Sequence, residues 1–219
     1  VCTDACLLGA WVAAKLETKE ITAENILDIG CGTGLLSLIL AQKTEATIDA
    51  VEINENAYLQ AKENIVLSTW KKRINIFNEN IIDYNAKEKY DLIICNPPFF
   101  ENQLKSIDAN RNAAMHGTQL SFTVLATTVK NNLKNDGIAA ILLPHNIVNE
   151  FAAIFKKEGF FVNEQLNVSH SSTHPFFRAV LLFSFIETDK IENTMAIKNL
   201  NNEYSTYFKK LLEDYYLHL

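Results

Sequence analysis

The sequence is poor in cysteine, proline and glycine, and it has no long uninterrupted apolar stretch. Its 219 residues include 4 cysteines, 4 prolines and 7 glycines. Cys2, Cys6, Cys31 and Cys95 form no CxxC pair and no zinc-type Cys/His spacing, so reduced thiols are expected. No run approaches the ~18 apolar residues of a membrane span, and no signal-peptide pattern opens the chain. We therefore expect a cytoplasmic protein that crosses no membrane.

Positive charge is also scarce, because the chain has 20 Lys and Arg residues and 26 Asp and Glu residues, which give a net charge of −6. This balance argues against a protein that holds nucleic acid by a general positive coat, although it leaves room for a local basic patch. His170 and His174 are four apart in a strand-and-turn sequence, where that spacing does not align two ligands, so no metal is expected. Val1 is not a methionine, so we expect a further segment before residue 1.

Short apolar runs alternate with amphipathic stretches of helical length. This pattern predicts an α/β fold with one mostly parallel sheet of seven strands, the last of them antiparallel. No linker or repeat divides the chain, so residues 1–219 are expected to form a single domain. The turn residues Asn135, Asp136 and Gly137 are expected to end a helix. Strands are predicted near 26–30, 47–53, 73–77, 90–95, 137–143, 161–169 and 177–187, and helices near 6–17, 34–42, 55–68, 119–134, 146–158 and 204–216.

The first predicted strand runs into LDIGCGTG and then directly into a helical segment. Gly30, Gly32 and Gly34 allow a sharp turn and let a ligand approach the backbone closely. Glu52 ends the second predicted strand, where doubly wound folds place an acid on ribose hydroxyls. A glycine turn alone is often structural, but together with Glu52 it predicts a nucleoside cofactor.

The stretch ICNPPFF, which follows the fourth predicted strand, fits an amine acceptor. The side-chain oxygen of Asn96 and the carbonyl of Pro97 can each accept an N–H from a conjugated amine. Pro97 and Pro98 fix φ, so these carbonyls are held rigidly. Phe99 can stack on a base that has left its stack, while Phe100 is adjacent and can also pack inward. Without the glycine loop, the same residues would read as a strand-ending turn with core phenylalanines.

These residues resemble the S-adenosylmethionine-dependent methyltransferases with a Rossmann-like fold, whose motif is an acid followed by GxGxG and a second acid after the next strand. The resemblance implies S-adenosyl-L-methionine as cofactor, with Asp28 near its methionine end and Glu52 on its ribose. In that family an acid after the third strand often lies beside the adenine. Here Asn80 and Asp83 are both candidates for that contact.

NPPF resembles the signature of the methyltransferases that act on adenine N6, cytosine N4, guanine N2 and glutamine amide nitrogen. The resemblance implies that Asn96, Pro97, Pro98 and Phe99 are the catalytic residues. It names the kind of acceptor, a planar conjugated NH₂ group, and leaves the acceptor itself open.

The segment TDACLLGAW resembles the TDxxLLGAW segment of the bacterial tRNA(Val) adenine-N6 methyltransferases, which act on the adenine 3′ of the anticodon. The resemblance extends to residues after NPPF and to the DYYL near the end of the chain. It places Thr3 and Asp4 beside the cofactor, and Arg111 and His116 where they can contact the RNA. It implies tRNA, specifically tRNA(Val), as the partner of a chain that we expect to be monomeric.

Three other functions stay open at this point. A protein glutamine-N5 methyltransferase of the release-factor type usually has NPPY and a larger substrate domain. An rRNA guanine-N2 methyltransferase shares NPPF but is usually longer. From another class, the chain could be a cofactor-binding module that recognises RNA without modifying it.

Overall fold

Eight strands form one sheet in the residues that the structure, a computed structural model, describes, which are 3–98 and 120–218. The strand order is β3-β2-β1-β4-β5-β7-β6-β8. The first five strands are parallel, and β7 is antiparallel to both β5 and β6. The strands are β1 (Asn25–Ile29), β2 (Thr47–Val51), β3 (Ile74–Phe77), β4 (Tyr90–Cys95), β5 (Leu133–Pro144), β6 (Phe161–Ser171), β7 (Phe176–Ser184) and β8 (Ile191–Lys198).

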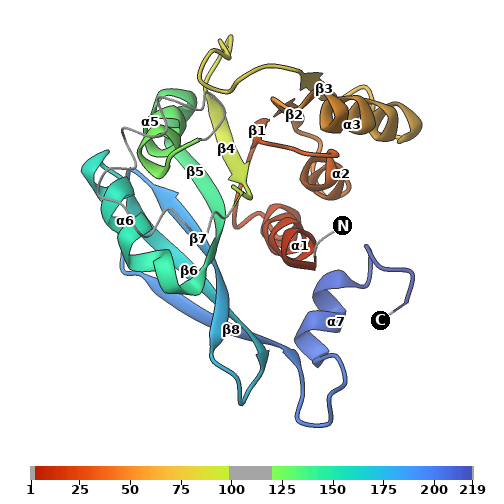
Figure 1. Ribbon diagram of the computed structural model, residues 1–219, viewed down its shortest axis with the longest axis vertical. Helices are drawn as coiled ribbons and strands as arrows, with labels where there is room; N and C mark the ends of the chain where they lie inside the picture. The colour runs from red at the N-terminus through yellow and green to blue at the C-terminus, as the bar shows by residue number, and fades with distance from the viewer. Residues whose placement is uncertain (1–2, 99–119, 219) are drawn as a thin grey trace.

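Helices cover both faces of this sheet (Figure 1). One buried apolar cluster joins α1, α2, α3 and α7 to one face, and a second joins α5 and α6 to the other. The sequence explains both layers, because the strands are buried on both sides and read as nearly continuous apolar runs. The helices are α1 (Thr3–Glu17), α2 (Leu35–Ala41), α3 (Glu55–Leu67), α5 (Phe122–Asn132), the 3-10 turn η2 (His145–Ile147), α6 (Val148–Lys157) and α7 (Thr206–Leu212).

Several helices begin where a short polar side chain satisfies a free backbone N–H. Asn54 accepts from the backbone N–H of Ala57 at 3.0 Å and so begins α3. Ser121 and Ser205 are the corresponding N-caps of α5 and α7. Such residues compete for backbone hydrogen bonds and therefore favour helix starts over helix interiors.

The predicted α/β fold and the parallel order of the first strands are confirmed, but the prediction of seven strands is wrong. An eighth strand, β8, pairs in parallel with β6 at the edge of the sheet. Its first four residues are exposed, and Met195 is its buried residue. Because most of its side chains are not buried, β8 has no continuous apolar run, and the apolar pattern does not reveal it.

The expected helix end at residues 135–137 is also wrong. These residues lie inside β5, which starts at Leu133 directly after α5. The pairing register with β4 shifts there, since Tyr90 pairs with Leu133 whereas Leu92 pairs with Ile138. A Cβ on Gly137 would lie 2.8 Å from the Leu133 side chain, so the glycine serves a close approach inside an irregular strand.

Candidate functional site

The predicted site lies at the carboxyl ends of three neighbouring strands. Ile29 of β1 pairs with Val51 of β2 on one side and with Cys95 of β4 on the other. The next residues along these strands are Gly30, Glu52 and Asn96, so the three sequence motifs meet at one edge of the sheet. The strand order reverses between β1 and β4, and ligands of doubly wound sheets bind at such a reversal.

The glycine loop after β1 has a backbone that other residues adopt only with strain. Gly30 and Gly32 have φ values of +67° and +57°, and a Cβ at either position would meet nothing within 4 Å. The space beside this loop is therefore available to a ligand. The N–H groups of Gly30 and Cys31 both donate to the carbonyl of Val51, at 2.9 and 3.1 Å, which fixes the loop on β2.

Glu52 is nearly buried, with 9% of its surface exposed, and it connects two parts of the site. One carboxylate oxygen accepts the backbone N–H of Gly32 at 2.9 Å, and the other accepts that of Asn54 at 2.7 Å. Each carboxylate oxygen has a second lone pair. Glu52 can therefore hold the loop and still accept from ribose hydroxyl groups.

Asp28 is a fully buried carboxyl group with one oxygen partnered and one not. Its Oδ2 accepts from the Ser37 hydroxyl at 2.7 Å and from the Ser37 backbone N–H at 3.1 Å. Its Oδ1 is buried without a hydrogen-bond partner. Burial raises the pKa of Asp28 to about 7, with a further contribution from the charge of Glu52, while the Ser37 hydrogen bonds oppose the rise.

Asn96 carries a second buried oxygen without a partner, its side-chain Oδ1. Asn96 lies two residues beyond Ile94, which pairs with Asp28, so both oxygens belong to the same edge of the sheet. An unpartnered buried acceptor costs about 1–3 kcal/mol, and such atoms in native proteins often serve a ligand. Pro97 is buried and Pro98 is exposed. Phe99, Phe100, Arg111 and His116 lie outside the described residues.

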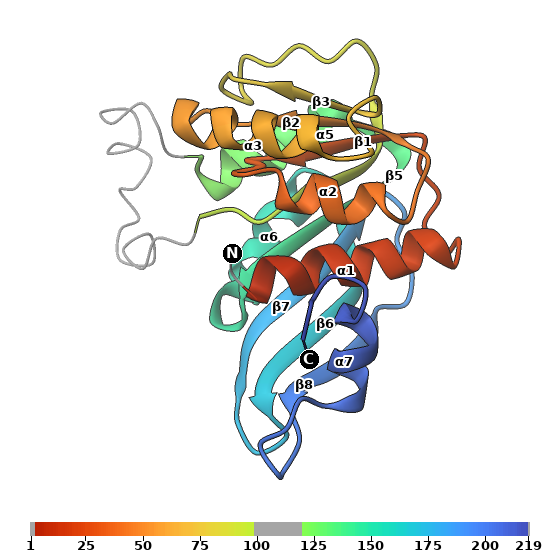
Figure 2. The ribbon, with the colours of Figure 1, turned by 90° about the vertical axis from the view of Figure 1, so that its right-hand side faces the viewer.

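Thr3 and Asp4 lie at the start of α1, where distant parts of the chain hold them. Asp4 accepts from the Arg178 Nε of β7 at 2.7 Å. Thr3 lies near the Tyr216 hydroxyl, which belongs to the segment after α7 and whose pKa is raised mainly by burial. Figure 2 shows the start of α1 on the same side of the molecule as the end of β4. Their contact with the cofactor stays a prediction.

The two candidates for the adenine contact occupy different surroundings. Asn80 begins a turn after β3, since its Oδ1 accepts the N–H of Ile82 and its carbonyl accepts the N–H groups of Asp83 and Tyr84. Asp83 lines a cavity of about 470 Å³ with Asp49. Asn80 therefore has a structural role in the turn, and the adenine contact stays a prediction for both residues.

Three residues that the sequence motifs do not include support the site. Ser37 holds Asp28, Asn64 donates from Nδ2 to the carbonyl of Thr33 at 2.9 Å, and Asn78 donates from Nδ2 to the carbonyl of Glu52 at 2.9 Å. Each belongs to an element after the motif that it supports. Serine and asparagine are common surface residues, so the sequence alone gave no signal for these roles.

The described residues bring together no group of three or more His, Cys, Asp and Glu that could hold a metal ion. Burial raises the pKa of the Cys31 and Cys95 thiols well above the usual range, so neither serves as a thiolate nucleophile at neutral pH. In the parts of the chain that the structure covers, no helix is long and apolar enough to cross a bilayer.

Comparisons with known proteins agree with this geometry. The family model "Methyltransferase small domain" matches residues 9–120. Among solved structures, a predicted O-methyltransferase from Agrobacterium tumefaciens has a TM-score of 0.69 at 16% identity and covers 95% of each chain. An S-adenosylmethionine-dependent methyltransferase from Clostridium acetobutylicum has a TM-score of 0.59 at 13% identity, over 83% of this chain and 92% of that chain. These likenesses support the Rossmann-like fold.

Curated relatives are considerably more similar in sequence. The tRNA1(Val) (adenine(37)-N6)-methyltransferase of Pectobacterium carotovorum is 37% identical over 219 residues, which cover 98% of this chain and 86% of the relative. The protein of the same name from Bacteroides thetaiotaomicron is 35% identical over 219 residues, covering 99% of this chain and 90% of the relative. The chain therefore belongs to the family of the tRNA1(Val) (adenine(37)-N6)-methyltransferases.

Proposed function

We propose that the protein methylates the exocyclic N6 amine of an adenine in tRNA, namely the adenine 3′ of the anticodon in tRNA(Val), with S-adenosyl-L-methionine as methyl donor. The family supports the reaction and the RNA. The observation that carries the proposal is the buried Oδ1 of Asn96, which has no partner and lies beside the glycine loop.

The residues at the strand ends fit S-adenosyl-L-methionine. The cofactor supplies a methyl group on a positively charged sulfur. Asp28 offers a buried oxygen without a partner to the methionine end, where a positive ammonium group compensates its burial. Glu52 offers free lone pairs to the ribose, and the open space at Gly30 and Gly32 lets the backbone approach the nucleoside.

Asn96 and Pro97 can make the acceptor amine more nucleophilic. The nitrogen of an exocyclic amine is a poor nucleophile because its lone pair is delocalised into the ring. The Asn96 Oδ1 and the Pro97 carbonyl can each accept one N–H, which favours a pyramidal nitrogen with its lone pair directed at the methyl group. The two prolines hold both acceptors in place, and such positioning lowers the barrier by holding the reacting atoms in line.

The experiment measures transfer of labelled methyl from S-adenosyl-L-methionine to unmodified tRNA(Val), to a translation release factor and to rRNA. Nuclease digestion then identifies the product nucleoside. We expect N6-methyladenosine in the tRNA alone. Label in the release factor would indicate a glutamine-N5 methyltransferase, and N2-methylguanosine in rRNA would indicate the guanine-N2 enzyme. Either result would overturn the proposed acceptor.

Asn96→Ala separates an enzyme from a module that only binds RNA. Removal of one preorganised hydrogen-bonding group commonly costs about 10²–10³ in kcat, and we expect a loss of that size with unchanged cofactor affinity. Asn131→Ala changes an exposed asparagine on α5 and is the matched control. Equal rates for the two variants would remove Asn96 from the mechanism.

A further inference from the structure

The hairpin of β6 and β7 differs in charge from the rest of the chain. Residues 165–186 contain no Asp or Glu, although the whole chain has 26. Three of the five histidines gather at its tip, because His170 and His174 belong to the hairpin and His145 follows β5 beside it. A polyanion that binds this segment of an acidic protein is not repelled by carboxylates of the segment itself.

Aromatic and imidazole rings form two groups near this tip. The rings of His145 and Phe176 lie 5.3 Å apart between centroids. His170 stacks on Phe177 at 4.0 Å with an interplanar angle of 8°, and the Arg178 guanidinium lies 5.3 Å from the centre of the Phe177 ring. Phe176 is 39% exposed. We call this set the hairpin surface: His145, His170, His174, Phe176, Phe177 and Arg178.

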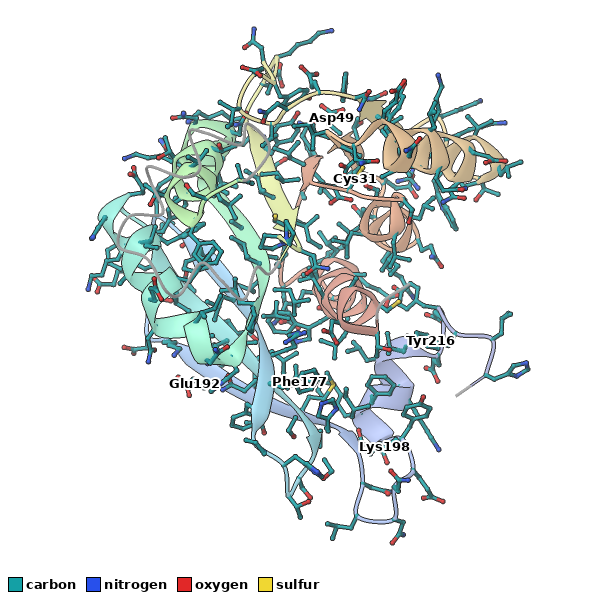
Figure 3. The ribbon with its side chains drawn as sticks, viewed as in Figure 1. Cys31, Asp49, Phe177, Glu192, Lys198 and Tyr216 are labelled. Carbon is teal, nitrogen blue, oxygen red and sulfur yellow. The ribbon has the colours of Figure 1, made fainter. Side chains whose placement is uncertain are left out.

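Within the described residues, Asp4 and Lys198 are charged groups that lie beside the hairpin surface. Asp4 approaches it from α1 and is paired with Arg178. From β8, Lys198 pairs in register with Ser171 and donates to the side-chain oxygen of Asn202 at 2.9 Å. Figure 3 labels Phe177 and Lys198 in the lower half of the molecule. Asp4 and Arg178 therefore neutralise each other, while Lys198 lies on the neighbouring strand.

The hairpin surface lies on the same edge of the sheet as Asn96, two strands away. Cys95, the last residue of β4, pairs with Ile141 of β5, and Pro144 of β5 pairs with Arg178 of β7. The chain leaving β4 through Asn96 therefore runs beside the last residues of β5, and β7 is the next strand. Two strand spacings are about 10 Å, and Phe176 lies five residues along β7 from Leu181, which pairs with Ile141. Asn96 and Phe176 are therefore about 16 Å apart, a distance that about five stacked nucleotides span at 3.4 Å each.

We infer that the hairpin surface binds the single-stranded nucleotides that flank the methylated base. Phe176 and His145 stack on one of these bases. This inference rests on the proposed function. Bases in RNA loops are commonly recognised by stacking on aromatic and histidine side chains. An exposed phenylalanine beside an imidazole provides such a platform. The phosphates between stacked bases meet Lys198 on the neighbouring strand and no carboxylate of residues 165–186.

Phe176→Ala tests the inference, because the side chain is exposed and its removal leaves the core intact. Loss of one base-stacking contact should raise KM for tRNA by roughly 5- to 150-fold, with the affinity for S-adenosyl-L-methionine changed less than about twofold. Phe176→Tyr keeps an aromatic ring and should restore a KM near that of the wild type. Ile186→Ala is the control, since Ile186 is 56% exposed and follows the opposite end of β7.

The outcomes separate this inference from the proposed function. If the wild type transfers no methyl group to tRNA(Val), the proposed function itself fails. If the wild type is active and Phe176→Ala has an unchanged KM for tRNA, the hairpin surface is not a contact and only the inference fails. An equal rise in KM for Ile186→Ala would also overturn it, because the effect would not be specific to the hairpin tip.

Discussion

Asp28→Asn should make the protein more stable and less able to bind its cofactor. Asp28 is fully buried, and its pKa is raised from 3.8 to about 7, mainly by burial. Because the pKa of the folded state exceeds that of the unfolded state, the contribution of Asp28 to stability is complete below about pH 4. It is lost as the pH rises towards 7. The difference corresponds to about 4 kcal/mol at 1.36 kcal/mol per pH unit.

Asparagine has the shape of the protonated carboxyl group and does not ionise. We therefore expect Asp28→Asn to exceed the wild type in free energy of unfolding by up to about 4 kcal/mol at pH 8, and by almost nothing at pH 4. Urea unfolding at a series of pH values measures this difference. The affinity for S-adenosyl-L-methionine should fall by about 10- to 150-fold, since a hydrogen bond to a charged group contributes about 1.5–3 kcal/mol. Titration calorimetry measures this loss.

Asp49→Asn is the matched control for this experiment. Asp49 belongs to the same sheet, but it is already satisfied by the side chains of Asn75, Tyr84 and Tyr90. Its replacement should destabilise the protein and leave cofactor affinity unchanged. The reasoning is refuted if Asp28→Asn is less stable than the wild type at pH 8, or if it binds the cofactor as tightly as the wild type does.

Two further predictions concern stability. Gly34 has φ +81°, and a Cβ at this position would lie 3.4 Å from the Ala61 Cβ. Gly34→Ala should therefore lower the free energy of unfolding by about 1–2 kcal/mol, as measured by urea titration, because alanine is strained at this φ. An unchanged urea midpoint would contradict this backbone strain. Tyr90→Phe removes the 2.7 Å hydrogen bond from Tyr90 to Asp49 and should lower the free energy of unfolding by about 1.5–3 kcal/mol, as measured by thermal or urea unfolding. The affinity for the cofactor should stay unchanged. A loss of that affinity would show that the hydrogen bonds around Asp49 affect the cofactor site.

The sequence by itself determined the fold class and the location of the site. The glycine loop, Glu52 and NPPF are local patterns, and each needs only its own strand and turn to be recognised. Strands of a parallel sheet end at a common edge, and the register of β1, β2 and β4 places these motifs side by side. Their roles toward cofactor and substrate stay predictions.

Only the tertiary structure decided which partners hold these motifs. Ser37 and Asp28 are nine residues apart, whereas Arg178 and Asp4 are 174 apart, and no local pattern links either pair. The same holds for β8, which has exposed residues over its first half and carries no apolar periodicity. Hydrogen bonds and ion pairs depend on where the packed elements bring their side chains. The sequence therefore named the candidate groups, and the packing of the sheet and helices decided which buried oxygens have no hydrogen-bond partner.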